Sequence, residues 1–255
     1  IWDKLNSGKY IKKYGALFVE HSNNDQVYFE FFDSLNPKYG QAFEVPRDEF
    51  DKDLLEHAQS LGTTVRQGCA VQEVLFHADY VEVQTDQGTF KSKYLIDASG
   101  RDAFLARKMN MRKPNRDLFN NVAVFQHYEG VDPLPGKRAG DITVGILPEG
   151  RWSWYIPFAD GRTSVGIVGD GTHFRKMTSL ETYTEESLRT CEALWERIKN
   201  AKRITKVGTH GNYSFTCEKY YGNRWILIGD AGTFLDPVFS SGVHLSVSGA
   251  SFARD

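Results

Sequence analysis

Cysteine is scarce in this sequence. The 255 residues include three cysteines, Cys69, Cys191 and Cys217, which lie far apart and show no paired spacing. Metal knuckles and small disulfide frameworks both depend on closely spaced cysteines, so we expect neither of them. A reducing compartment is the natural location for a chain of this kind.

An excess of charge of one sign is also absent, as are long apolar runs. The formal net charge is -2, with 31 basic and 33 acidic residues interleaved along the chain. Because no basic stripe is present to neutralise a row of phosphates, nucleic acid is not expected as a partner. No apolar run is long enough to span a bilayer and no signal-peptide pattern opens the chain, so we expect no membrane association and a cytoplasmic location.

The glycine-rich loop of dinucleotide-binding proteins is missing as well. No G-x-G-x-x-G occurs anywhere in the chain, and the sequence starts at Ile1 without an initiator methionine. The segment 242–255 has the pattern of a helix that simply stops. We therefore expect the chain to be a fragment, truncated at its N-terminus before a first strand and phosphate loop.

The patterns that are present alternate between strands and helices. Hydrophobic residues make up 40% of the chain and charged residues 25%, which is enough to bury a sizeable core. We expect an α/β fold with a large mixed or antiparallel sheet, in two parts that the chain enters and leaves more than once. The expected elements are a hairpin of 15–20 and 27–32, a helix at 48–61, strands at 64–76, 80–85, 89–93 and 94–96, a hairpin of 152–158 and 163–168 around Asp160-Gly161, a helix at 180–199 and a strand at 225–228.

The most informative segment is 225–242. A buried strand leads into Gly229-Asp230-Ala231-Gly232, and 234–242 then leads into a helix. Glycines let the backbone approach a ligand closely, and Asp230 can accept hydrogen bonds from sugar-like hydroxyls. Amides at the start of a helix favour an anion or an electron-rich ring edge. The alternative is a strand–turn–helix connection in which the glycines serve only the turn.

Gly229-Asp230 resembles the second FAD fingerprint of the aromatic-hydroxylase-like flavoproteins. Asp97-Ala98-Ser99-Gly100-Arg101 resembles the companion fingerprint, and Arg47 stands where that superfamily keeps an arginine near the FAD phosphates. An arginine in this position can also be merely solvated. The resemblance implies an FAD-binding part, 45–107 with 216–255, and a substrate-binding part, 1–44 with 108–215. The implied FAD contacts are Arg47, Asp97, Gly100, Arg101, Gly229, Asp230, Ala231, Pro237 and Gly242.

Two further motifs resemble those of the flavin-dependent halogenases. Trp152 to Pro157 matches W-x-W-x-I-P, and Phe234 to Gly242 matches F-x-x-P-x-x-S-x-G. On a strand, Trp152, Trp154 and Ile156 would share one face, and Ser153 and Tyr155 the other. The alternative is an aromatic-rich core strand. The resemblance implies halide or substrate contacts at Ser240, Ser241, Gly242, Trp152 and Trp154.

Lys13 is the candidate catalytic residue. Halogenases of this kind require a lysine close to the substrate pocket, and Lys13, just before Tyr14-Gly15-Ala16, matches it. Such a lysine can act on hypohalous acid as a charged donor or, when desolvated, as an amine. Lys12 is the poorer candidate, because strand alternation lets only one of the two face the pocket. The alternative is an exposed lysine, the commoner state of this residue type.

The resemblance implies halogenation of an electron-rich aromatic substrate. A flavin reductase would supply reduced FAD, oxygen would give a flavin hydroperoxide, halide would attack it, and Lys13 would direct the hypohalous acid. Tryptophan-type halogenases carry a glutamate where this chain has Phe239. This difference favours a phenol- or pyrrole-type substrate, either free or tethered to a carrier protein.

Two other functions remain open at this stage. One is a flavin-dependent monooxygenase or reductase without halogenase activity, and the other is a non-catalytic fragment. Because the phosphate loop is missing, we expect the isolated chain to be an incomplete enzyme that purifies without flavin colour.

Overall fold

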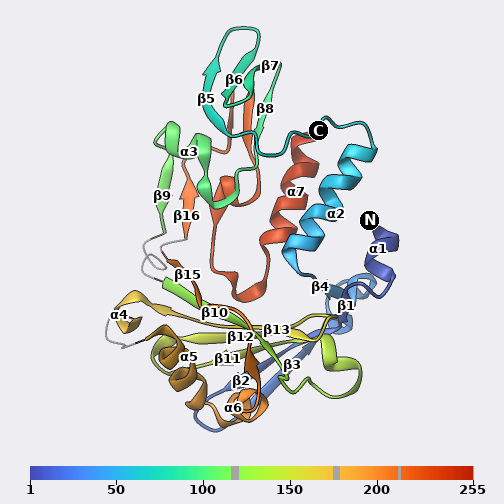
Figure 1. Ribbon diagram of the computed structural model, residues 1–255, viewed down its shortest axis with the longest axis vertical. Coiled ribbons are helices and arrows are strands. Elements are labelled where there is room, and N and C mark those ends of the chain that lie inside the picture. Colours follow the sequence, from blue (N-terminus) through green and yellow to red (C-terminus); the bar gives the residue numbers. More distant parts are fainter. Residues whose placement is uncertain (116–120, 175–178, 212–213, 255) are drawn as a thin grey trace. The chain divides into compact units, whose positions relative to one another are not determined.

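A computed structural model describes residues 1–115, 121–174, 179–211 and 214–254 of the protein. The chain divides into two units. The first comprises Ile1–Thr63 and Asn120–Gly211, and the second comprises Thr64–Phe119 and Asn212–Asp255. Both units contain segments that are distant in the sequence, and Figure 1 follows the chain through them by colour.

Residues 45–63 lie in the first unit, whereas the sequence predicts a single FAD-binding part that includes all of 45–107. Contacts to one carboxylate account for this placement. Asp53 of helix α2 (Arg47–Ser60) accepts hydrogen bonds from Lys4 Nζ, Lys9 Nζ and Tyr10 Oη, at 2.7 to 2.8 Å. These bonds join α2 to the N-terminal segment and hold the pKa of Asp53 well below its usual range. The assignment of FAD and substrate to separate parts stays a prediction.

The first unit is built on a mixed sheet that has eight strands within the described residues. The order is β14-β10-β13-β12-β11-β2-β3, with β15 beside β10, and only β2 and β11 run parallel in this sheet. The predicted α/β class with a large mixed sheet is therefore confirmed. Its strands are β2 (Gly15–Glu20), β3 (Gln26–Glu30), β10 (Asn121–Glu129), β11 (Ile142–Ile146), β12 (Trp152–Pro157), β13 (Arg162–Asp170), β14 (Lys202–Arg203) and β15 (Gly208–Gly211).

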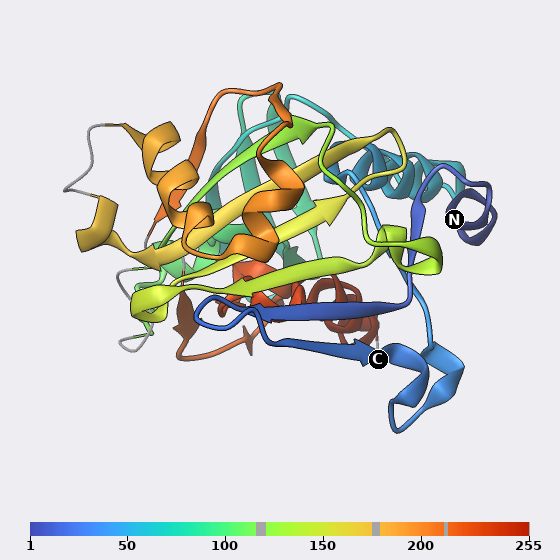
Figure 2. The same ribbon diagram turned by 90° about the horizontal axis from the view of Figure 1, so that it is seen from below.

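The first unit also contains a second, smaller sheet and several helices. Strands β1 (Ile11–Lys13) and β4 (Ala42–Glu44) form a separate antiparallel pair. Helices α5 (Leu180–Arg189) and α6 (Glu192–Ile198) cover one face of the sheet (Figure 2). Under them lies a core that includes Leu17, Val19, Tyr155, Val165, Ile167, Tyr183, Leu188 and Leu194. The short helices are α1 (Trp2–Asn6) and α4 (Gly171–Phe174).

Both predicted hairpins are confirmed. β12 and β13 pair through a turn at Asp160-Gly161, where Gly161 has a φ of +86°, in the region that favours glycine. β2 and β3 pair as expected, although the second strand ends at Glu30 and Phe31–Asp33 forms a 3-10 turn.

The single helix predicted over 180–199 is wrong, because the chain breaks between α5 and α6. At the break, Cys191 is fully buried. The side chain of Asn24, from the turn between β2 and β3, accepts a hydrogen bond from the Ala193 amide at 3.2 Å. A residue 169 positions away thus helps to cap α6, and this contact favours two helices over one.

The second unit contains three small sheets within its described residues. Their orders are β5-β6-β7, β17-β18-β8 and β19-β16-β9, and β8 and β18 are parallel. The strand predicted at 64–76 begins only at Val71, after a turn in which Gly68 has a φ of +64°. The elements are β5 (Val71–Phe76), β6 (Val81–Thr85), β7 (Gly88–Ser92), β8 (Leu95–Asp97), α3 (Phe104–Lys108), β9 (Arg112–Pro114), β16 (Phe215–Cys217), β17 (Tyr221–Gly222), β18 (Trp225–Leu227), β19 (Thr233–Phe234) and α7 (Gly242–Arg254).

In the described ranges of both units, no helix combines the length and the apolar character needed to cross a membrane. The same residues hold no group of three or more histidine, cysteine or acidic side chains arranged to bind a metal ion.

Candidate functional site

The residues predicted to form the site lie in both units. Lys13, Arg47, Trp152 and Trp154 belong to the first unit. The second unit holds Asp97, Gly100, Arg101, Gly229, Asp230, Ala231, Pro237, Ser240, Ser241 and Gly242.

The turn at Gly229 is packed tightly against helix α7. Strand β18 leads through Ile228 into a 3-10 turn, η7 (Gly229–Ala231), and Gly229 has a φ of +54°. A Cβ atom at Gly229 would lie 2.4 Å from the Oγ of Ser246 on α7. A Cβ atom at Gly249, one turn further along α7, would meet Ile228 Cβ at 3.3 Å. Small residues on both elements thus let the turn and the helix approach closely.

Asp230 lies in this turn, beside the start of α7. A Cβ atom at Gly242, the first residue of α7, would lie 3.8 Å from Asp230 Oδ1. The carboxylate is half-buried. The neighbouring Ala231 is fully buried, and its predicted contact with FAD stays a prediction. A 13-residue helix such as α7 presents backbone N–H groups and a positive dipole end at this point.

The segment that enters α7 follows the predicted motif. Asp236 caps a 3-10 turn, Pro237–Phe239, by accepting a hydrogen bond from the Val238 amide at 3.1 Å. Ser240 ends the turn in the left-handed region, with a φ of 52°. Ser240 and the side chain of Phe239 are exposed, the latter with 79% of its surface accessible.

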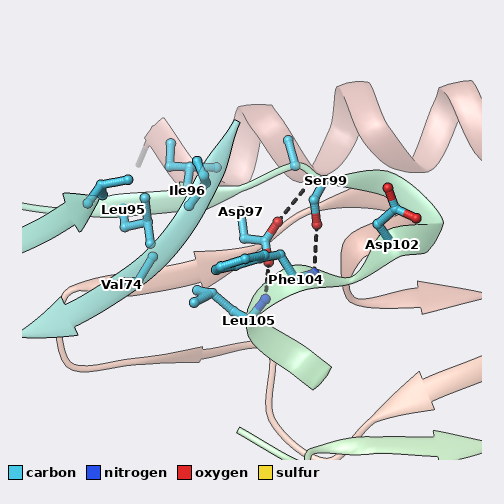
Figure 3. A pocket seen from close by; sticks show the side chains of 11 residues that line it. Val74, Leu95, Ile96, Asp97, Ser99, Asp102, Phe104 and Leu105 are labelled. Carbon is cyan, nitrogen blue, oxygen red and sulfur yellow. Dashed lines mark hydrogen bonds between the residues drawn. The ribbon is translucent and has the colours of Figure 1, made fainter. Parts of the chain in front are cut away.

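Asp97 holds its own loop together (Figure 3). Its Oδ1 accepts a hydrogen bond from the Ser99 amide and its Oδ2 one from the Leu105 amide, both at 2.8 Å. Ser99 Oγ accepts from the Phe104 amide, also at 2.8 Å. Asp97 is 6% exposed, so these bonds satisfy a buried carboxylate and fix the path from β8 to α3. Direct contact of Asp97 with FAD stays a prediction.

A pocket of about 360 Å³ lies beside this loop. Figure 3 shows the apolar wall of this pocket, which is formed by Val74, Leu95, Ile96 and Phe104. Asp102 lines the pocket from the loop. Gly100 and Arg101 belong to that loop. Gly100 has a φ of +63°, and the Arg101 side chain is exposed.

The two tryptophans of the W-x-W-x-I-P strand share a face of the large sheet, as predicted. Along β12, Trp152 and Trp154 are half-buried, whereas Ser153 and Tyr155 are fully buried on the side that α5 and α6 cover. The two indole centroids lie 5.7 Å apart. Trp154 Nε1 donates a hydrogen bond to Ser164 Oγ at 3.1 Å, which fixes the ring.

Phe125 extends this aromatic face onto the next strands. Its ring centroid lies 6.2 Å from that of Trp154 and 5.4 Å from that of His210. Gly166 makes room for the indole, because a Cβ there would come within 2.3 Å of the Trp154 ring. The motif search missed Phe125 and Gly166, since both lie on other strands and only sheet register brings them to Trp154.

Lys13 is buried and paired, whereas Lys12 is exposed. The Lys13 residue is 8% exposed, and its Nζ lies 2.8 Å from Glu44 Oε1 in an ion pair. Burial raises the pKa of Glu44, and Lys13 opposes part of that rise. Lys12 and Lys13 alternate between exposed and buried along the strand, and Glu44 is a partner that the sequence motifs do not indicate. That Lys13 faces a substrate pocket stays a prediction.

A second buried carboxylate, Asp141, anchors the chain just after Lys13. Its Oδ1 accepts hydrogen bonds from the amides of Tyr14, at 2.6 Å, and Gly15, at 3.1 Å. Its Oδ2 accepts one from Tyr28 Oη at 2.7 Å. Burial and this bond raise the pKa of the Tyr28 phenol to about 12. The backbone around Lys13 is thus held from a distant part of the sequence.

Arg47 begins α2 and forms a bidentate ion pair with Asp51. Its Nε lies 2.8 Å from Asp51 Oδ1, and a second bond at 2.9 Å reaches Oδ2. The Arg47 side chain is 62% exposed. Its predicted contact with the FAD phosphates stays a prediction.

The second unit offers what the ribityl side of a flavin requires. Gly229 brings the turn close to α7, Asp230 supplies a carboxylate for hydroxyl groups, and α7 begins with a glycine at the same place. The Asp230 carboxylate and the backbone N–H groups at the start of α7 are therefore of the chemical kinds that suit the group implied by the fingerprint.

Comparison with known proteins identifies a family match and close structural matches. The family model for tryptophan halogenase matches residues 15–253. A curated relative, the chlorinase of 1H-pyrrole-2-carbonyl on a peptidyl-carrier protein from Pseudomonas fluorescens, is 29% identical over 280 residues. That alignment covers 99% of this chain but 62% of the chlorinase, so the chain spans less than two thirds of its relative.

Two solved structures match with a TM-score of 0.89. One is CmlS, a flavin-dependent halogenase, at 30% identity, covering 99% of this chain and 47% of CmlS. The other is a flavoprotein/dehydrogenase from Cytophaga hutchinsonii, at 27% identity, covering 99% of this chain and 64% of that protein. The expected FAD-binding type of fold is confirmed by these matches.

Proposed function

Because this chain belongs to the tryptophan halogenase family, we propose that its protein halogenates an electron-rich aromatic compound with reduced FAD, oxygen and halide. The observation that carries the proposal is the extent of the family match. Residues 15–253 include both the flavin-type turn at Gly229 and the aromatic strand at Trp152. The proposal is also supported by the similarity of the chain to a chlorinase and to a flavin-dependent halogenase.

The FAD would be held mainly by the turn η7 and the start of α7. Asp230 would accept hydrogen bonds from the ribityl hydroxyls, and the backbone near Gly229 and Gly242 would lie against the ligand. Arg47 would lie near the FAD phosphates, and Asp97, Gly100 and Arg101 would contribute further FAD contacts, as the resemblance implies. When bound, reduced flavin would supply two electrons that reduce oxygen to the peroxide level, and oxygen at that level can oxidise halide to hypohalous acid with release of water.

The substrate would lie on the aromatic face of the large sheet. Trp152, Trp154 and Phe125 offer ring faces and edges on which an electron-rich aromatic ring can pack. We propose a phenol- or pyrrole-type substrate, free or tethered to a carrier protein. Phe239, in place of the glutamate of tryptophan-type enzymes, supports this choice. The relatives include both a pyrrole chlorinase and a tryptophan 2-halogenase.

Lys13 would act on the oxidant, and Ser240, Ser241 and Gly242 would bind the halide. An ammonium group that donates a hydrogen bond to the oxygen of hypohalous acid makes the halogen more electrophilic. A separate flavin reductase would supply the reduced FAD.

A second candidate function is flavin-dependent oxidation without halogenation. The flavoprotein/dehydrogenase of Cytophaga hutchinsonii, which matches with the same TM-score as the halogenase CmlS, favours it. A halide-dependence assay separates the two. The complete protein, a flavin reductase, NADH and oxygen are incubated with phenols and pyrroles, with and without bromide or chloride, and products are measured by mass spectrometry. Halogenated product that requires added halide supports halogenation, and flavin turnover or hydroxylation without it contradicts the proposal.

Replacing Asp230 with alanine is expected to weaken FAD binding by about 1.5–3 kcal/mol, because the ribityl hydroxyls lose a charged acceptor. This loss corresponds to a rise in Kd of roughly 10- to 150-fold. Asp230→Asn keeps an acceptor oxygen and should lie between the parent and Asp230→Ala. Titration with FAD, followed by fluorescence, measures the three affinities, and thermal unfolding checks that the variants are folded. Equal affinity in all three would contradict the fingerprint.

A further inference from the structure

Lys13 and Glu44 form a buried ion pair between two short strands. β1 and β4 pair antiparallel, with Lys13 opposite Ala42 and Ile11 opposite Glu44. The Lys13 and Glu44 side chains are therefore diagonal neighbours on the same face. Their charged atoms lie 2.8 Å apart, and the two side chains are 10% and 11% exposed.

The surroundings of Lys13 hold its side chain in one orientation. Besides the Glu44 carboxylate, the ring of Phe31 lies 5.8 Å from Lys13 Nζ, within the range of a cation–π contact. The Lys13 backbone is fixed by its pairing with Ala42, and the following amides are held by Asp141. The ammonium thus has little freedom to point elsewhere.

Stability alone is a poor reason to bury this pair. Removing two charges from water is unfavourable, and a well-packed apolar pair of similar volume is often as stable or more stable. A buried carboxylate that touches the one lysine proposed to be catalytic therefore indicates a role in the reaction.

We propose that Glu44 is a positioning residue for Lys13. Its carboxylate aims the Lys13 side chain, so that Lys13 can donate a hydrogen bond to hypohalous acid. The inference rests on the proposed function for its chemical meaning. The ion-pair part of it is testable without that function.

The first experiment compares Glu44→Gln and Glu44→Asp with the parent protein in complete form. Glu44→Gln keeps the shape but loses the charge, and we expect its kcat for halogenation to fall on the order of 10- to 100-fold. Oxidation of reduced FAD by oxygen should stay within about twofold, since the pair acts after that step. Glu44→Asp keeps the charge on a shorter side chain and should recover part of the loss.

The pH profile adds a readout that a purely structural role would not move. Glu44 faces Lys13 and feels the charge of Asp141, and its pKa lies above the usual glutamate range because of burial. As the pH falls through that raised pKa, the carboxylate gains a proton and releases the ammonium. The yield of halogenated product per flavin oxidised should therefore fall on the acid side in the parent, and this fall should be missing in Glu44→Gln.

The second experiment needs no halogenation. Acetic anhydride modifies uncharged amines, and mass spectrometry of peptides gives the rate at each lysine. Loss of the carboxylate releases the Lys13 side chain from its ion pair, so Lys13 should react on the order of tenfold faster in Glu44→Gln, while the exposed Lys12 is unchanged. Thermal unfolding of Lys13→Met/Glu44→Leu, expected to be near that of the parent, checks that the pair is not required for folding.

The outcomes separate the two proposals. No halide incorporation by the parent defeats the proposed function, and the Lys13 modification rate still decides whether Glu44 controls the lysine. Parent-like halogenation with an unchanged pH profile in Glu44→Gln overturns the positioning role. An unchanged Lys13 modification rate overturns it as well.

Discussion

Replacing Lys13 with alanine is expected to abolish halogenation by the complete protein, a loss of at least about 100-fold. Oxidation of reduced FAD by oxygen should change less than about twofold, because the lysine acts only after the oxidant has formed. The two activities are measured in one reaction, as halogenated product by mass spectrometry and as oxygen consumption. Their separation is the expected result.

Lys12→Ala is the matched control for this experiment. Lys12 precedes Lys13 on the same strand but is exposed, so its removal changes the same charge without reaching the buried face. We expect normal halogenation in Lys12→Ala. Normal halogenation in Lys13→Ala, or an equal loss in both variants, would contradict the assignment of Lys13.

Unfolding is the competing explanation for an inactive Lys13→Ala protein. The substitution leaves Glu44 buried without its partner, and breaking a buried pair in this way typically destabilises a protein by about 3–5 kcal/mol. Lys13→Ala/Glu44→Gln removes the orphaned charge and should recover much of that stability. Halogenation should stay absent in the double variant, which distinguishes a catalytic loss from a folding defect.

The sequence predicted those parts of the fold that depend on local pattern. The hairpin around Asp160-Gly161 follows from its turn residues, and the faces of the Trp152 strand follow from alternation. The break between α5 and α6 does not, because Asn24 is contributed from a turn far away in the sequence. Long-range caps of this kind leave no local signal.

The candidate site divides in the same way. Gly229 and Asp230 are recognisable because a glycine turn between a strand and a helix is a local motif. Glu44 reaches Lys13 only through the pairing of β1 with β4, 31 residues along the chain, and nothing near either residue indicates the contact. Asp97 carries a recognisable motif, but its bonds to the Ser99 and Leu105 amides depend on the path of the loop.

Gly229→Ala is the second substitution for which we expect a large loss of stability, because it would disturb the turn and helix α7 together. The residue has a φ of +54°, where alanine is strained, and an added Cβ would lie 2.4 Å from Ser246 Oγ and 3.1 Å from Ser246 Cβ. Strain and overpacking together should destabilise the protein by roughly 2–6 kcal/mol. Thermal unfolding should show this loss, and FAD binding should fall with it.

Two companion variants separate packing from ligand approach. Ser246→Gly removes Oγ and Cβ but leaves the Ser246 Cα, which lies 3.2 Å from the added Cβ. Gly229→Ala/Ser246→Gly should therefore regain part of the packing loss but not the strain at the positive φ. Gly242→Ala adds a Cβ that lies 3.8 Å from Asp230 Oδ1, an ordinary contact, so its fold should be kept. If the ligand lies against the start of α7, the same methyl group obstructs it, and affinity for FAD falls while the melting temperature does not. Parent-like FAD affinity in a stable Gly242→Ala protein would place the ligand away from α7. A parent-like melting temperature in Gly229→Ala would show that the turn does not pack on Ser246 as described.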